Sequence, residues 1–95
     1  MDARGYLDTR TPEPPEALAR WLRDVPLAGT PLEGVTGVAL ASLDRAREAP
    51  GRVRESAFHL LAADALLTYA CEAALGEAHP AQSLSRLLHQ VVGND

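Results

Sequence analysis

Three polar side chains recur at every fourth position of the longest uninterrupted helical segment in the sequence, namely Asp64, Thr68 and Glu72. Residues spaced by four lie on one narrow stripe of an α-helix. A buried carboxylate needs a cation, hydrogen-bond donors or a metal ion beside it, because an isolated charge is costly to remove from water. Three alternatives follow: a solvated stripe, a polar seam paired with arginine at a helix or subunit contact, and a ligand or metal site.

Glu55 and His59 are also one helical turn apart, and such a pair is half of a metal site. Di-iron bundles use Glu-x-x-His on two helices, whereas this sequence has neither that spacing nor a second copy of the pair. We therefore expect a hydrogen-bonded surface pair and keep Glu55 and His59 only as weak metal candidates. The sequence predicts no resident metal and no cofactor.

The chain has one cysteine, Cys71, which excludes an intramolecular disulfide. Cys71 can be combined on paper with Glu72, Glu77 and His79 into a zinc site, but the paired Cys or His spacing of zinc sites is missing. Its apolar neighbours predict a reduced thiol buried in the core.

Four arginines flank a proline-glycine turn: Arg45, Arg47, Arg52 and Arg54. The guanidinium group binds carboxylates and phosphates through two parallel hydrogen bonds, so this arginine corner is a candidate anion or partner patch. The alternative is a solvated turn in which the arginines pair with acidic residues one helical turn away. The sequence has no glycine-rich phosphate loop and no interleaved aromatic residues to support a nucleotide or nucleic acid as the anion.

The composition argues against several classes of function. No serine, cysteine or threonine stands in a recognisable nucleophile motif with a base, so a catalytic assignment has no anchor. The formal net charge of −4 disfavours a broad basic surface for nucleic acid. The first ten residues lack the apolar run of a signal peptide, and Asp64 and Glu72 interrupt the one long apolar segment. We expect a cytoplasmic protein that binds neither nucleic acid nor membrane.

The same composition predicts an all-α fold, because alanine and leucine are abundant while aromatic and β-branched residues are few. The chain of 95 residues has the size of one domain, so we expect residues 1–95 to form a single helical domain. All nine cationic side chains are arginine, a bias that we associate with GC-rich bacterial coding.

Proline, glycine and capping signals divide this domain into an N-terminal arm and four helices. The arm covers residues 1–13, with one helical turn near 3–7 and with Tyr6 and Leu7 to pin it down. The helices are expected at about 15–25, 31–48, 52–75 and 80–92. Thr30 and Glu33 predict a capping box, and Gly34 begins a strip of small residues where another backbone approaches. Short connections favour a four-helix, bundle-like arrangement.

The third expected helix, 52–75, has no proline or glycine and is apolar nearly all the way round, which is typical of a helix buried among partners. Three shorter helices cover only part of its circumference, so a leftover apolar patch should mark an interface. We predict a self-associating structural or protein-interaction module, with a dimer favoured. The predicted interface comprises Leu60, Asp64, Leu67, Thr68, Cys71 and Glu72.

Two other functions stay open. One is a helical protein that binds a small ligand or metal through Glu55, His59, Asp64 and Glu72, and the other is a regulatory subunit that docks on a protein partner through the arginine corner. Residues 60–75, LLAADALLTYACEAAL, resemble a helix of polyprenyl synthases that reads roughly LLAGDALLTLAFE. Those enzymes bind magnesium and diphosphate through DDxxD motifs, and this sequence has none. The resemblance therefore implies an alanine- and leucine-rich buried helix and no activity.

Overall fold

The described part of the chain is all-helical. In the computed structural model, residues 1–10, 13–48, 51 and 53–93 are described, and they contain five helices. These are α1 (Ala3–Asp8), α2 (Glu16–Asp24), α3 (Pro31–Arg47), α4 (Val53–Leu75) and α5 (Pro80–Val92). Helices α2 to α5 correspond to the four expected helices, with bounds that differ by one residue at most.

The start of α3 follows from its local sequence. The Thr30 hydroxyl accepts a hydrogen bond from the Glu33 backbone N–H at 3.2 Å, and the Glu33 carboxylate accepts one from the Thr30 backbone N–H at 3.5 Å. Pro31 occupies the first turn, where its missing N–H costs nothing. The predicted capping box is therefore confirmed, and it fixes the point at which the chain enters α3.

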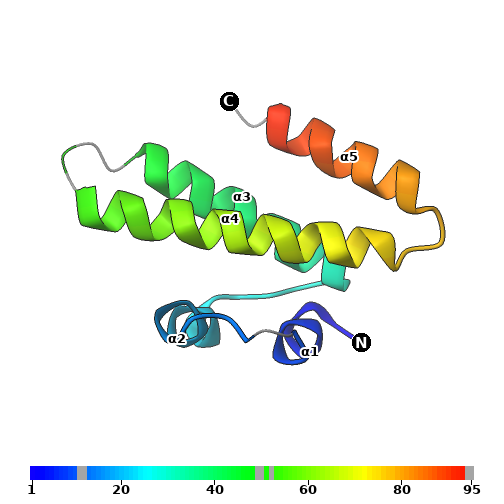
Figure 1. Ribbon diagram of the computed structural model, residues 1–95, viewed down its shortest axis with the longest axis horizontal. Helices are drawn as coiled ribbons and strands as arrows, with labels where there is room; N and C mark the ends of the chain where they lie inside the picture. The colour runs from blue at the N-terminus through cyan, green and yellow to red at the C-terminus, as the bar shows by residue number, and fades with distance from the viewer. Residues whose placement is uncertain (11–12, 49–50, 52, 94–95) are drawn as a thin grey trace.

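Helices α3 and α4 form the main pair of the fold. They run side by side in opposite directions, with α5 on one side of the pair and α1 and α2 on the other (Figure 1). The face of α4 that is buried in this arrangement is rich in alanine, including Ala62, Ala63, Ala70 and Ala74. Small side chains allow α3 to approach closely, and Leu66 and Val35 fill the centre of the core.

The N-terminal arm contains a helix, α1, which is held to the rest of the chain by more contacts than the sequence predicted. Tyr6 and Leu7 are buried and belong to the hydrophobic core, so the prediction that they pin the arm is confirmed. Arg4 donates hydrogen bonds to the backbone carbonyls of Leu22, at 2.6 Å, and Val25, at 2.5 Å. These carbonyls lie at the end of α2, where no further helical turn can satisfy them, so Arg4 caps α2 from α1.

Gly34 is the contact point between α1 and α3. A Cβ built on Gly34 would collide with the Cβ of Ala3 and would lie 2.9 Å from the carbonyl oxygen of Ala28. Ala3 is fully buried there. The predicted close approach is thus confirmed at Gly34, whereas a Cβ at Gly37 would meet nothing within 4 Å.

Candidate functional site

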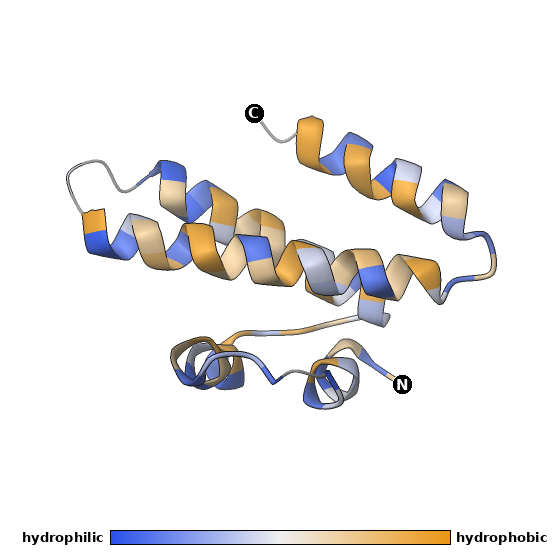
Figure 2. Cartoon of the chain, in the orientation of Figure 1, coloured by the Kyte–Doolittle hydropathy of each residue, from blue (hydrophilic) through white to orange (hydrophobic). Residues whose placement is uncertain are grey.

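The face of α4 that points away from the rest of the chain is the first candidate site. Leu60, Leu61 and Leu75 are 51%, 71% and 61% exposed, although buried leucine is the rule in a helix of this composition. Helix α5, which packs against α4, carries two further exposed apolar residues, Leu88 and Val92, both about two-thirds exposed. The outward surface, as we name it here, consists of Val53, Leu60, Leu61, Leu75, Leu88 and Val92. Figure 2 shows apolar residues recurring along the whole length of α4 and α5.

The predicted interface residues lie on this side of α4. Leu60, Asp64, Thr68, Cys71 and Glu72 are exposed, and Leu67 is partly buried against the core. The Thr68 hydroxyl donates to the backbone carbonyl of Asp64 at 3.0 Å, so Asp64 and Thr68 form part of a solvated stripe in the single chain.

The prediction of a buried thiol at Cys71 is wrong. Cys71 is exposed. The reason is that α4 is apolar nearly all the way round, so its hydropathy pattern indicates only through the Asp64, Thr68 and Glu72 stripe which side faces away from the core. The alanine-rich side packs against α3, and the side that carries Leu60 and Cys71 is left outside.

Glu72 connects α4 to the N-terminal helix. Arg10 donates to the Glu72 carboxylate at 3.2 Å and to the Tyr6 hydroxyl at 3.0 Å, and its guanidinium carbon lies 3.8 Å from the centroid of the Tyr6 ring. The Tyr6 hydroxyl in turn donates to the Tyr69 backbone carbonyl at 3.1 Å. Burial raises the pKa of Tyr6, an effect that the positive charge of Arg10 opposes. Burial, reinforced by the negative charge of Glu72, also raises the pKa of Tyr69.

The expected surface pair of Glu55 and His59 must be corrected. His59 is only 5% exposed, and its ring makes edge contacts with Trp21 and Phe58 at centroid distances of 5.7 and 5.3 Å. Its Nδ1 atom is buried without a hydrogen-bond partner among the described residues. His59 is therefore a core residue that helps to hold α2 against α4. Within the same residues, no three His, Cys, Asp or Glu side chains are grouped closely enough to hold a metal ion.

The arginine corner is exposed at three of its four positions. Arg45, Arg47 and Arg54 point to solvent, and Arg52 lies outside the described residues. Arg47 is 3.9 Å from the Asp44 carboxylate one turn earlier in α3, so at this position the arginine pairs within its own helix.

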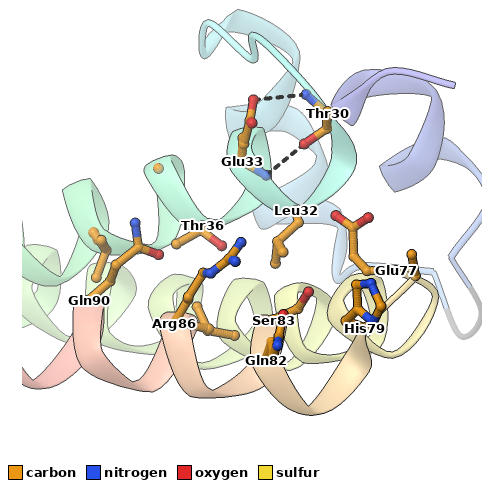
Figure 3. A pocket seen from close by; sticks show the side chains of 14 residues that line it. Thr30, Leu32, Glu33, Thr36, Glu77, His79, Gln82, Ser83, Arg86 and Gln90 are labelled. Carbon is orange, nitrogen blue, oxygen red and sulfur yellow. Dashed lines mark hydrogen bonds between the residues drawn. The ribbon is translucent and has the colours of Figure 1, made fainter.

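Sequence reasoning missed a polar cleft between α3 and α5. Thr36 lies on the α3 side, and Gln82, Ser83 and Arg86 lie on the α5 side (Figure 3). Arg86 lies far along the chain from the other arginines, so no charge cluster pointed to it. Of the outward surface, only Leu60 was in the predicted interface; the other five residues were absent from it, namely Val53, Leu61, Leu75, Leu88 and Val92.

Helix α4 has the length and mean hydropathy of a membrane span, with a hydropathy of 1.3 and one-third of the apolar window (33%) buried in the fold. The core helix of a soluble protein passes the same test, so the prediction about membranes stays a prediction. Searches with protein-family models, against curated proteins and against solved structures found nothing that matches this chain.

Proposed function

We propose that this protein is a self-associating helical module in which two copies pack α4 against α4 in antiparallel orientation. In this proposal α2 to α5 form a bundle-like unit in one domain, and the second copy covers the side of α4 that the chain leaves open. The observation that carries the proposal is the outward surface of α4, where Leu60, Leu61 and Leu75 are all more than half exposed.

The apolar area argues for a partner. Burying a large aliphatic side chain contributes about 1.5–3 kcal/mol relative to leaving it in water. The outward surface holds six such side chains on two helices that pack against each other, and exposed apolar residues gathered on one side of a protein commonly mark interfaces. A standard interface takes about 800 Å² from each partner. That is about an eighth of the 6117 Å² accessible surface of this chain, which two helix faces can supply.

The pattern along α4 favours a second copy as the partner. A two-fold symmetric interface brings the same surface of each copy together. In an antiparallel pair centred on Asp64, the middle residue of α4, positions symmetric about 64 meet. Val53 then lies opposite Leu75 of the other copy, and Ala57 lies opposite Cys71.

The charges on α4 complement each other in the same register. Arg54 and Glu72 lie on the same flank of α4, since 18 residues correspond to five full turns at 3.6 residues per turn. Antiparallel pairing about Asp64 therefore brings Arg54 of each copy close to Glu72 of the other. Opposite charges at both ends of the contact favour this orientation over the parallel one.

Light scattering at micromolar concentration tests the proposal. We expect the wild-type protein to have the mass of a dimer. Leu60→Glu and Leu61→Glu should reduce it to a monomer with an unchanged far-ultraviolet spectrum, because both positions are exposed in the single chain. Ala41→Glu is the matched control, since it places the same charge at an exposed position of α3. A wild-type monomer, or a dimer that survives both substitutions, would overturn the proposal.

A charge reversal tests the orientation. Arg54→Glu alone and Glu72→Arg alone should each weaken the dimer several-fold, because an exposed ion pair contributes about 0.2–1 kcal/mol and the dimer has two. Glu72→Arg also loses the ion pair with Arg10 inside the chain, so the register is tested by the affinity that the double variant recovers relative to Glu72→Arg alone. The double variant should recover most of the lost affinity. Additive weakening in the double variant would exclude the antiparallel register.

The same outward surface is open to a lipid bilayer, and one measurement separates the two occupants. Wild-type protein should remain in the supernatant when it is centrifuged with neutral phosphatidylcholine vesicles. Sedimentation of monomers with the vesicles, lost in Leu61→Glu, would replace the second copy by a membrane surface and refute the dimer.

A further inference from the structure

The cleft between α3 and α5 has the size of a small-molecule site. Its volume is about 530 Å³, inside the range of about 300–1,000 Å³ for ligand pockets. It lies on the flank of α5 that faces α3, whereas Leu88 lies on the other flank. The cleft is thus separate from the outward surface, and its function is independent of self-association.

A buried hydroxyl group on the α3 side lacks a partner. Thr36 is 4% exposed, and its Oγ1 atom has no hydrogen-bond partner among the described residues. Leaving such a group unsatisfied costs about 1–3 kcal/mol. Figure 3 shows its oxygen directed into the space between α3 and α5, and Ser83, 8% exposed, brings a second hydroxyl from α5.

Arg86 is the arginine of the cleft, whose lining also includes His79. Its guanidinium group extends from α5 toward Thr36 (Figure 3). Among the residues described, Arg86 makes no ion pair and no hydrogen bond, in contrast to Arg4 and Arg10. A planar guanidinium with unused donors beside two hydroxyl groups is a set suited to a carboxylate, which accepts two parallel hydrogen bonds.

Acidic groups restrict the charge of the ligand. Glu33 and Glu77 also line the cleft, so a doubly charged phosphate would meet two carboxylates and a single arginine. Glu33 is engaged in the cap of α3, and Glu77 lines the end of the cleft on the other side of Leu32 from Arg86 (Figure 3). A ligand with a positive group near Glu77 and a carboxylate near Arg86 would be complementary to the charges of the cleft.

We propose that the cleft binds a small aliphatic amino acid. Its carboxylate lies on Arg86 and the hydroxyls of Thr36 and Ser83, and its ammonium group lies toward Glu77. Leu32, Leu40 and Leu87 supply the apolar lining for the side chain. Thr36 Oγ1 is shielded from water in the free protein. Binding in this mode therefore requires that this hydroxyl becomes accessible when the ligand enters.

Calorimetric titration with four probes tests this assignment. We expect leucine to bind, 4-methylpentanoate, which lacks the amino group, to bind about tenfold more weakly, and 3-methylbutylamine, which lacks the carboxylate, to bind more weakly still. Inorganic phosphate should not compete. Equal binding of phosphate and leucine would show an unspecific anion site and overturn the proposal. If none of the probes binds, water alone occupies the cleft, and this result would also overturn the proposal.

Two substitutions separate binding from structure. Arg86→Gln should lower leucine affinity by about tenfold or more without changing the melting temperature of the free protein, because Arg86 has no partner to lose. Thr36→Val should lower affinity while raising the melting temperature, because it removes an unsatisfied buried hydroxyl. Arg20→Gln in α2 is the control of equal charge change and should leave leucine affinity unaltered. Unchanged leucine affinity in both Arg86→Gln and Thr36→Val would refute the site.

Discussion

At the scale of single residues, Tyr6 joins the N-terminal helix to α4. Its ring lies in the core, its hydroxyl donates to α4 at Tyr69, and Arg10 covers the ring from the side that faces Glu72. The Tyr6 side chain thus links the N-terminal helix to a part of α4 that lies more than 60 residues later in the sequence. The protonated phenol is the form that this environment accepts, because burial penalises the phenolate.

Alkaline pH should therefore destabilise the fold. The pKa of Tyr6 is raised above the ordinary value of about 10, so its contribution is complete below that pH and is lost as the pH rises through the raised pKa. We expect the free energy of unfolding, measured with urea at a series of pH values, to fall above about pH 10. Tyr69 contributes in the same direction.

Tyr6→Phe checks the assignment. It should lower the stability at neutral pH by about 1 kcal/mol through the lost hydrogen bond to Tyr69 and should make the alkaline fall shallower. Tyr69→Phe should reduce the fall without removing that bond, whose acceptor is the Tyr69 backbone. An alkaline fall of the same steepness in wild type and in the variant with both phenylalanines would assign it to other groups.

The sequence-based predictions were least accurate for the environments of single residues. Cys71 and His59 were assigned opposite environments from those they occupy: Cys71 is exposed and His59 is buried. Both errors come from the nearly uniform hydropathy of α4, in which the stripe of Asp64, Thr68 and Glu72 is a weak indication of the exposed side. His59 is buried because Trp21 and Phe58 enclose it, and contacts between α2 and α4 are not visible in either segment alone.

At the scale of elements, helix boundaries followed from local chemistry. The Thr30–Glu33 capping box and the prolines at 31 and 80 act within one turn, so they could be read from the sequence. The role of α1 could not, because a helix of six residues is stabilised by what it touches rather than by its own hydrogen bonds.

Arg4 should be worth more to stability than an ordinary surface arginine. Its two hydrogen bonds satisfy carbonyls at the end of α2, and bonds to charged groups contribute about 1.5–3 kcal/mol. We expect Arg4→Ala to lower the free energy of urea unfolding by about 2 kcal/mol. Arg20→Ala, which removes an exposed ion pair, should change it by less than about 0.5 kcal/mol. Equal effects of the two substitutions would show that the cap of α2 is dispensable.

Two glycines of α3 should respond to alanine with opposite signs. Gly34→Ala forces a methyl group against Ala3 and the Ala28 backbone, so we expect a loss of about 2–3 kcal/mol or more. Gly37→Ala meets open space and replaces a poor helix former, so it should gain about 0.5–1 kcal/mol. Thermal unfolding of both variants in parallel checks this pair. A stable Gly34→Ala variant would mean that α1 does not pack on α3.

At the scale of the whole molecule, the all-helical class and the helices themselves could be predicted, because composition and the proline, glycine and capping signals can be read locally in the sequence. The arrangement of the helices determines which side of α4 is covered, and that depends on contacts such as Ala3 with Gly34. The cleft between α3 and α5 was unpredictable for the same reason. Thr36 and Arg86 are 50 positions apart, and only the packing of the helices places them on one cavity.

Asp64 supplies the sharpest prediction for the assembly. In the proposed antiparallel pair Asp64 would lie beside the Asp64 of the other copy at the two-fold axis, where two carboxylates repel each other and weaken the contact. Asp64→Leu should therefore tighten the dimer by about tenfold or more, as burial of an added aliphatic side chain is worth at least 1.5 kcal/mol. Asp64→Asn, which removes only the charge, should give a smaller gain.

Sedimentation equilibrium over a concentration series measures both effects. The monomer itself should be nearly unaffected, since Asp64 is exposed and surface substitutions change stability by about 0.5 kcal/mol or less. Thr68→Leu provides the comparison, because it adds a similar apolar group one turn away without removing a charge. If Asp64→Leu leaves the dissociation constant unchanged or raises it, the contact between copies does not include the outward side of α4 around Asp64.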